Sequence, residues 1–185
     1  MRSAPALVLL ALTAACASTE AEWDRIEDPR FVAEDGTYAL ELPVGWARSE
    51  RALTHDGWEH QTITFNAGAV LEPSEGQAID AASPQLLAAM QDELSAQPGI
   101  ELVEVRPAVL DGLAAFRMHF RRIPEEGAEE PVPPSQAVLY AAIDGVTLYA
   151  FSLESTSTAA FPRDLEAFEL MVASFRRLDP ARPAP

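Results

Sequence analysis

Residues 136–153 restrict the fold of this chain more than any other stretch. They form two apolar runs that meet at Asp144-Gly145, a dipeptide favoured in two-residue type I′ hairpin turns because both turn positions need a positive φ. A turn there would place Tyr140 opposite Tyr149. Both faces of the hairpin would be apolar because side chains alternate across a strand. The two sets are Leu139, Ala141, Ile143, Val146, Leu148 and Ala150, and Val138, Tyr140, Ala142, Tyr149, Phe151 and Leu153. The sequence therefore predicts a central hairpin covered on both sides.

Three further Asp-Gly dipeptides, at 35–36, 56–57 and 111–112, predict hairpins elsewhere in the chain. The first would turn the chain into a one-sided strand over 37–42. The second would join a polar ribbon in which His55 faces Trp58 and His60 faces Leu53. Reversals between adjacent strands make a sheet largely antiparallel.

The hairpin around Asp111-Gly112 would place Glu104 opposite His119, and Pro107 indicates a position nearer the sheet edge. Its predicted core-facing residues are Val103, Val105, Val109, Phe116, Met118 and Phe120. Its predicted outward-facing residues are Glu104, Arg106, Arg117 and His119.

Two amphipathic helices are expected to cover the sheet. Ser83-Pro84 is typical of a helix start and Pro98-Gly99 of a stop. A second helix is predicted over 162–177. The apolar faces carry Leu86, Leu87, Met90 and Leu94 in the first helix, and Leu165, Phe168, Met171, Val172 and Phe175 in the second. The fold class is therefore α+β, a largely antiparallel sheet of hairpins covered by two helices.

The N-terminus has the pattern of an export signal. Arg2 is followed by a short apolar run and by Thr13-Ala14-Ala15-Cys16. The apolar run is shorter than the ~20 residues that span a bilayer. The small residues before Cys16 resemble the lipobox of bacterial lipoproteins, in which the cysteine is acylated, although Thr13 stands where that pattern prefers an aliphatic residue. The alternative is an ordinary secretory signal cut after Ala15 or Ala17.

Composition bounds the remaining organisation. A chain of 185 residues with 48% hydrophobic residues is long enough for one domain with a core. We expect a signal peptide at 1–15, an acidic lipid-anchored tether at 16–30, one domain at 31–178 and a disordered tail at 179–185. The net charge of −16 argues against nucleic acid as the main partner, because phosphate neutralisation needs a basic surface.

The order of these parts resembles the PsbP-like superfamily, which includes the photosystem II extrinsic subunit and bacterial DcrB-type lipoproteins. The residues that carry the resemblance are Gly36-Thr37-Tyr38-Ala39-Leu40-Glu41-Leu42-Pro43-Val44-Gly45-Trp46 and, in the last helix, Met171-Val172-Ala173-Ser174-Phe175. The resemblance covers residues 31–178. It implies an α/β/α sandwich and a binding or assembly role, and it carries over no catalytic residue.

The histidines are the residues that could suggest catalysis or metal binding. His55 and His60 would lie on one face of their hairpin, but two imidazoles without a third ligand make a poor zinc site. Glu104 and His119 could form a carboxylate–imidazole pair, although such cross-strand pairs are ordinary in sheets. The chain has no Gly-x-Ser-x-Gly, His-Glu-x-x-His, CxxC or phosphate-loop motif. We expect no catalytic residue, metal or cofactor.

The polar ribbon over 51–62 is the predicted protein-contact surface. Arg51, Leu53, Trp58 and His60 have the composition of an interface with an aromatic anchor, and the alternative is that Trp58 folds back onto a neighbouring loop. The leading functional hypothesis is a non-enzymatic lipoprotein, in the outer membrane and facing the periplasm, that binds an envelope protein. One alternative is a carrier of a small apolar or lipid ligand between sheet and helix, with room left by Ala141, Ala142 and Ala150. The remote alternative is a hydrolase.

Overall fold

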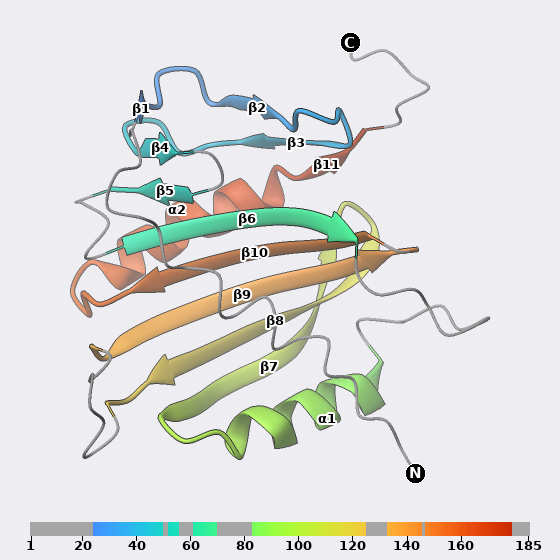
Figure 1. Cartoon of the computed structure of the whole chain (residues 1–185), viewed down its shortest axis with the longest axis vertical. Helices are drawn as coiled ribbons and strands as arrows, with labels where there is room; N and C mark the ends of the chain where they lie inside the picture. Colours follow the sequence, from blue (N-terminus) through green and yellow to red (C-terminus); the bar gives the residue numbers. More distant parts are fainter. Residues whose placement is uncertain are drawn as a thin grey trace.

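The computed structural model describes residues 24–49, 52–55, 61–69, 83–124, 133–145 and 147–178. Within them the chain forms a large sheet in the order β1-β4-β5-β6-β10-β9-β8-β7, a small sheet in the order β11-β3-β2, and helices α1 and α2 (Figure 1). The elements are β1 (Asp24–Arg25), β2 (Arg30–Val32), β3 (Tyr38–Glu41), β4 (Ala47–Ser49), β5 (Ala52–Thr54), β6 (Gln61–Ala69), α1 (Pro84–Ser95), β7 (Ile100–Leu110), β8 (Leu113–Arg122), β9 (Ser135–Asp144), β10 (Thr147–Ser155), α2 (Phe161–Ala173) and β11 (Arg176–Arg177). The predicted α+β class is confirmed.

The hairpin of β9 and β10 is central, as predicted, because β6 pairs with β10 and β8 pairs with β9. Its predicted faces are also confirmed: Val138, Ala142 and Phe151 lie in the core beneath α2, and Leu139 and Ala141 lie in the core beneath α1. The predicted register is wrong by two residues, since Tyr140 pairs with Phe151 and Asp144 with Thr147. A shift of two keeps every side chain on its face.

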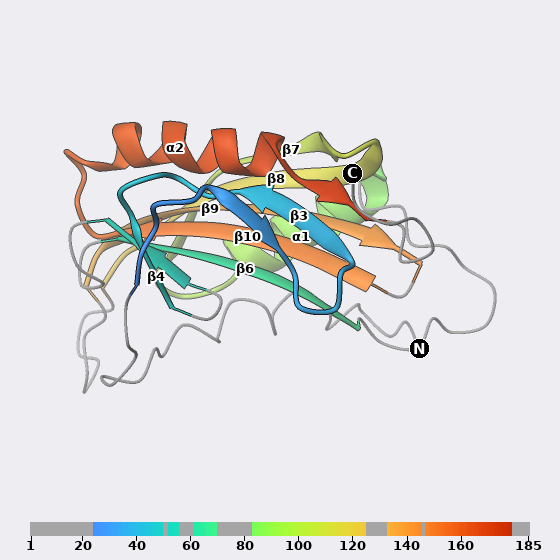
Figure 2. The same cartoon turned by 90° about the horizontal axis from the view of Figure 1, so that it is seen from above.

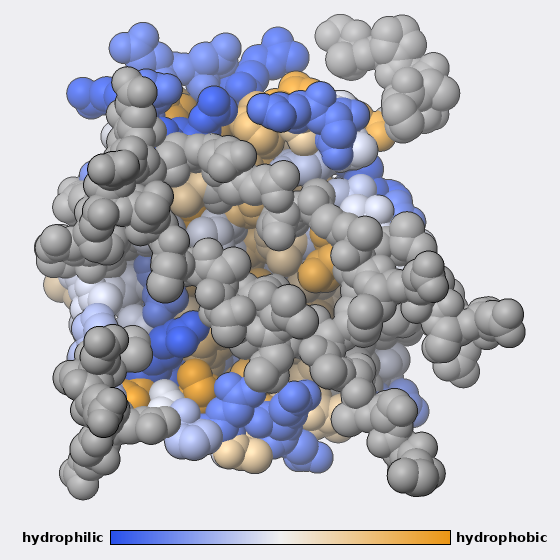
Figure 3. All heavy atoms as spheres, viewed as in Figure 1, coloured by the Kyte–Doolittle hydropathy of each residue, from blue (hydrophilic) through white to orange (hydrophobic). Residues whose placement is uncertain are grey.

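The two helices cover opposite faces of the large sheet (Figure 2). α1 begins at Pro84 as predicted and buries Met90 and Leu94, while its outward side is hydrophilic (Figure 3). α2 ends at Ala173, four residues before the predicted end. The Ser174 hydroxyl donates to the Met171 carbonyl (2.6 Å) and accepts from the Glu41 N–H (2.8 Å). These bonds cap the end of the helix, and the next residues form β11, which pairs with β3.

The β7–β8 hairpin has the predicted type I′ turn, with φ of 47° at Asp111 and 78° at Gly112, and Glu104 pairs with His119. A β-bulge between Leu102 and Glu104 leaves Val103 exposed, so its predicted core position is wrong. Val109 is also exposed (70%), because α1 packs mainly against the earlier part of β7. The other correction concerns Arg117, which is buried although its pattern predicted an outward side chain.

The N-terminal part of the fold begins before Phe31. Asp24–Arg25 pairs with β4, and Ile26 is buried in the core, so residues 24–30 of the predicted tether belong to the fold. The small sheet then packs on the α2 side through Tyr38 and Leu40. In the polar ribbon Leu53 pairs with Ile63, not with His60. Neither helix of the described part is long and apolar enough to cross a membrane.

Candidate functional site: an ionic strip beside helix α2

A strip of charged side chains runs along β7 and β8 on the face that carries α2. Residues 101 and 104 are an odd number apart, so a regular strand would point their side chains to opposite faces. The bulge at Val103 changes this alternation: Glu101 pairs with Arg121 and Glu104 with His119. We call the set Glu101, Glu104, Arg106, Arg117, Arg121 and Glu169 the ionic strip.

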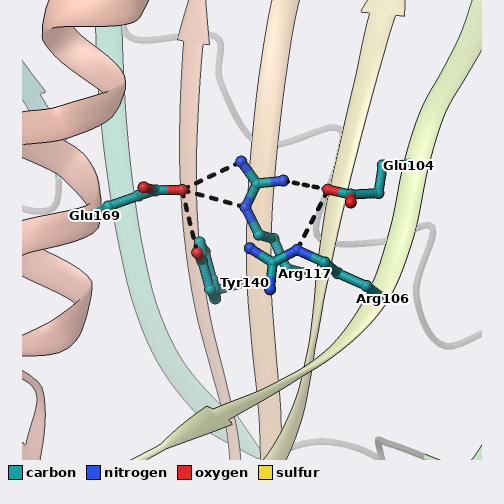
Figure 4. A network of polar contacts seen from close by, with 5 residues as sticks. All are labelled: Glu104, Arg106, Arg117, Tyr140 and Glu169. Atoms are coloured by element: carbon teal, nitrogen blue, oxygen red, sulfur yellow. Dashed lines mark hydrogen bonds and ion pairs between the residues drawn. The ribbon is translucent and has the colours of Figure 1, made fainter.

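Arg117 is the centre of the strip (Figure 4). Its Nη1 donates to Glu104 Oε2 at 2.8 Å, and its Nε and Nη2 donate to Glu169 Oε1 at 3.3 and 3.2 Å. Tyr140 donates its hydroxyl to the same Glu169 oxygen at 3.4 Å, and its ring centroid lies 5.8 Å from the Arg117 guanidinium carbon. Arg117 therefore ties the flank of α2 to edge strand β7 through β8 and β9.

The strip combines a buried cation with accessible carboxylates. The Arg117 side chain is 7% exposed, whereas those of Glu104 and Glu169 are 46% and 42% exposed. Arg106 donates to Glu104 Oε2 at 3.3 Å, and Arg121 lies 3.4 Å from Glu101. Among the described residues, the bonds to Glu104 and Glu169 use one oxygen of each carboxylate.

Two titratable groups lie at the centre of the strip. Burial, and then the Glu169 carboxylate, raise the pKa of Tyr140, so its hydroxyl stays a donor near neutral pH. Burial, and then the Arg117 charge, lower the pKa of His119 below its ordinary value of 6.5. The imidazole stacks on Phe161, with 5.6 Å between the two ring centroids. Its buried Nε2 has no hydrogen-bond partner among the described residues. His119 is therefore neutral at pH 7.

The Glu104–His119 pair does not have the contacts of a general base and its orienting carboxylate. The two residues are cross-strand neighbours as predicted, but Glu104 accepts its hydrogen bonds from Arg117 and Arg106. In a triad-type site the base is hydrogen-bonded to the group that orients it. The arrangement is that of an ion-pair network that holds side chains in place.

Comparison with solved structures identifies the architecture. The cyanobacterial PsbP (CyanoP) of Synechocystis sp. PCC 6803 matches over 90% of this chain and 99% of its own, with a TM-score of 0.54 and 13% identity. The fold is PsbP-like. The Ran-binding protein Mog1p of Saccharomyces cerevisiae matches over 84% of this chain and 98% of its own, with a TM-score of 0.53 and 10% identity. No protein-family model and no curated protein sequence matches this chain.

Of the four predicted contact residues, Leu53 lies in the described part of this PsbP-like fold. Arg51, Trp58 and His60 lie outside the described residues, as does Cys16. Leu53 is fully buried in β5, so its prediction as a contact residue is wrong. An alternating pattern in a short polar ribbon did not show which of its faces meets the core.

His55 is placed beside Trp46 and the start of α2, and it is not part of a metal site in the described part of the chain. Its ring centroid lies 5.4 Å from that of Trp46, and its Nδ1 lies 3.2 Å from Arg163 Nη2. No group of three or more His, Cys, Asp or Glu residues there could hold a metal ion.

The described interface between sheet and α2 is filled by side chains. Phe151, Phe168 and Phe175 are buried, and the centroid of Phe175 lies 5.2 Å from Phe151 and 5.0 Å from Tyr149. Ala142 is buried in the same cluster. Aromatic rings therefore make up much of the core cluster in which this alanine is buried.

A second ion-pair cluster, which sequence reasoning missed, lies at the end of the sheet where two hairpins turn. Arg177 donates Nη1 to Asp144 Oδ2 at 2.6 Å, and its backbone N donates to Asp111 Oδ2 at 2.9 Å. Its Nη2 also donates to the Asp111 carbonyl at 3.2 Å. We call these three residues the C-terminal clasp. Both aspartates were predicted as turn formers, and nothing in the local sequence indicates that one arginine holds both.

Proposed function

We propose that this chain is a non-catalytic binding module of the bacterial cell envelope that binds a protein partner. The observation that carries the proposal is the ionic strip. Arg106, Arg121 and Glu101 are half-exposed charges beside a buried, doubly bonded Arg117. Charged groups held in fixed positions give an interface its specificity and orientation.

The fold supports the same role. Mog1p, which shares it, is by name a Ran-binding protein, so this architecture can present a protein-binding surface. Both outer strands of the large sheet are also poorly suited to accept an added strand. Within the described residues β1 is two residues long, and β7 carries a bulge and Pro107. Such features block edge-to-edge pairing, so a partner would contact side chains instead.

Arg51, Trp58 and His60 remain a second proposed contact region. His55, which is near these residues in the sequence, has its Nδ1 3.2 Å from Arg163 Nη2. We further propose that Cys16 carries a lipid anchor and that the protein sits in the outer membrane and faces the periplasm. The lipobox-like Thr13-Ala14-Ala15-Cys16 supports this, and Ala17 is not the Asp of the inner-membrane retention pattern.

Affinity capture from gently solubilised envelopes tests the binding role. Arg106→Glu/Arg121→Glu reverses two charges of the strip, and Arg25→Glu/Arg30→Glu makes the same change in β1 and β2, where both arginines are also exposed. We expect one protein to co-purify with the wild type and the control variant but not with the strip variant. Equal capture by all three would remove the strip from the interface, and a single enriched lipid without protein would favour the carrier instead.

The anchor has a separate test. Intact-mass analysis of the mature chain should show lipid mass on Cys16, and Cys16→Ser should release the protein into the soluble fraction. Separation of the two membranes on a density gradient then locates the wild type. An unmodified Cys16 would contradict the anchor and leave the binding proposal standing.

A further inference from the structure

The Asp-Gly turns that organise this fold also carry a chemical weakness. In an Asp-Gly sequence the glycine N can attack the aspartate Cγ, since glycine has no side chain to hinder the approach. The new C–N bond forms a five-membered succinimide, and the hydroxyl of the carboxyl group leaves with the amide proton as water. One water then opens the ring at either carbonyl, which gives aspartate or isoaspartate. The net change is an isomerisation with one extra carbon in the main chain.

We propose that Arg177 protects two of these turns, Asp111-Gly112 and Asp144-Gly145, from isoaspartate formation. The reaction requires the carboxyl group to rotate toward the N–H of the next residue. Arg177 holds Oδ2 of Asp111 through its backbone N at 2.9 Å and its Nε at 3.4 Å. It holds Oδ2 of Asp144 through Nη1 at 2.6 Å. Charge-assisted bonds of this kind are stronger than neutral ones and fix the rotamer.

The backbone contacts of Arg177 restrain the turn itself as well as its side chain. Its Nη2 donates to the Asp111 carbonyl at 3.2 Å, which is part of the peptide bond that the reaction would convert. The pairing of β11 with β3 also holds the backbone of Arg177 in place. One C-terminal arginine thus immobilises the reacting carboxyl group of both turns and one of the two peptide groups.

Loss of this protection would damage the fold at a sensitive place. A two-residue type I′ turn fixes the register of its hairpin. An additional main-chain carbon at Asp111 would disturb the pairing of β7 with β8, which carries most of the ionic strip. The same lesion at Asp144 would reach the central hairpin.

Asp35-Gly36 provides a reference within the same molecule. Asp35 Oδ1 accepts from Thr37 N at 3.0 Å and from Thr37 Oγ1 at 2.6 Å. The attacking group, Gly36 N, donates to the Ala33 carbonyl at 2.8 Å. None of these bonds involves Arg177, so a change at Arg177 should leave the reactivity of this turn unaltered.

Ageing of the purified protein at neutral pH and physiological temperature tests the proposal, with isoaspartate measured at each turn by peptide mapping. The variants are Arg177→Gln and, as a matched control, Arg176→Gln. Arg176 lies in the same strand but donates to the Ala173 and Phe175 carbonyls and to neither aspartate. In Arg177→Gln we expect formation at Asp144 to rise about fivefold, the factor that corresponds to ~1 kcal/mol of restraint. The rise at Asp111 should be smaller, because the backbone N–H of residue 177 still donates to its Oδ2. Asp35 and the control variant should match the wild type.

Unchanged formation at Asp111 and Asp144 in Arg177→Gln would overturn the proposal. An equal rise at all three turns would overturn it as well, because that pattern indicates general loosening of the fold. If Arg177→Gln does not fold, Arg177→Lys serves instead. A single ammonium cannot reproduce the bonds to both aspartates, so at least one of the two turns must age faster, and no rise at either would count against Arg177.

Discussion

The ionic strip and the C-terminal clasp use the same chemistry in different surroundings. In each, one arginine bridges carboxylates from two elements: Arg117 joins Glu104 and Glu169, and Arg177 joins Asp111 and Asp144. The Arg117 side chain is 7% exposed and that of Arg177 is 34% exposed. A buried charge depends on its partners far more than one that water reaches. The comparison teaches that burial of the shared cation, more than the number of ion pairs, sets the energetic weight of each cluster.

Matched removal of the carboxylate charges should give the largest difference between the two regions. Glu104→Gln/Glu169→Gln leaves the buried Arg117 guanidinium without a counter-charge and should lower the free energy of unfolding by about 3 kcal/mol. Asp111→Asn keeps a residue suited to the positive φ at this turn position. Together, Asp111→Asn/Asp144→Asn should cost about 1 kcal/mol, since water solvates Arg177. Urea unfolding of freshly prepared proteins measures both.

Equal losses in the two double variants would contradict this account of burial. A larger loss at the clasp would mean that turn closure, not charge burial, dominates. Each single variant should be measured as well, because carboxylates that share one arginine are coupled and their effects are not additive.

Replacement of the two arginines by a residue of similar length should give a smaller effect. Arg117→Met removes the buried charge, fills much of its volume, and leaves Glu104 and Glu169 to water, so we expect a loss of about 1–2 kcal/mol. Arg177→Met should cost below about 1 kcal/mol. Thermal unfolding followed by circular dichroism measures both. A stabilised Arg117→Met would show that the strip costs stability and is kept for another reason.

The contrast between the regions also shows what the sequence could and could not predict. Asp-Gly dipeptides and alternating apolar residues are local signals, and they correctly predicted the Asp111-Gly112 turn and both faces of the central hairpin. The bulge at Val103 has no such signal, because the sequence does not show which residue of a strand is left unpaired. Arg117 was expected to face outward because its burial depends on Glu169, which is 52 residues away.

The register of the central hairpin is a second feature that the local sequence did not predict. Asp144 belongs to β9 and pairs with Thr147, and of Asp144 and Gly145 only the glycine has a positive φ. The Asp144 carboxylate is bonded to Arg177, 33 residues later in the chain. Local turn preference predicted the hairpin, while a distant arginine holds the residue that the pattern had assigned to the turn.

Acidification should affect the ionic strip through His119. Burial and the nearby Arg117 charge lower its pKa in the folded state, so the unfolded chain binds its proton first as the pH falls. Stability from the neutral imidazole is complete above about pH 6.5 and decreases as the pH falls from there toward the folded-state pKa. His119→Gln should flatten this part of the profile relative to the wild type, and His55→Gln, which replaces an exposed histidine, provides the control. The free energy of unfolding, measured between pH 7 and 5, tests this prediction. An unchanged slope in His119→Gln would exclude His119 as the source of the pH dependence.

The smallest effect on stability should come from the rim of the strip, where the effect on binding should be largest. Arg106 and Arg121 are each 48% exposed and form single ion pairs with Glu104 and Glu101. Exposed pairs contribute about 0–1 kcal/mol, so Arg106→Ala/Arg121→Ala should unfold within ~0.5 kcal/mol of the wild type. Arg25→Ala/Arg30→Ala, which replaces exposed arginines of β1 and β2, should do the same. If the rim variant alone loses the captured partner at unchanged stability, the rim provides recognition while Arg117 provides the support. A rim variant that loses partner and stability together would mean that the outer charges also hold the fold, and the distinction between rim and buried centre would then fail.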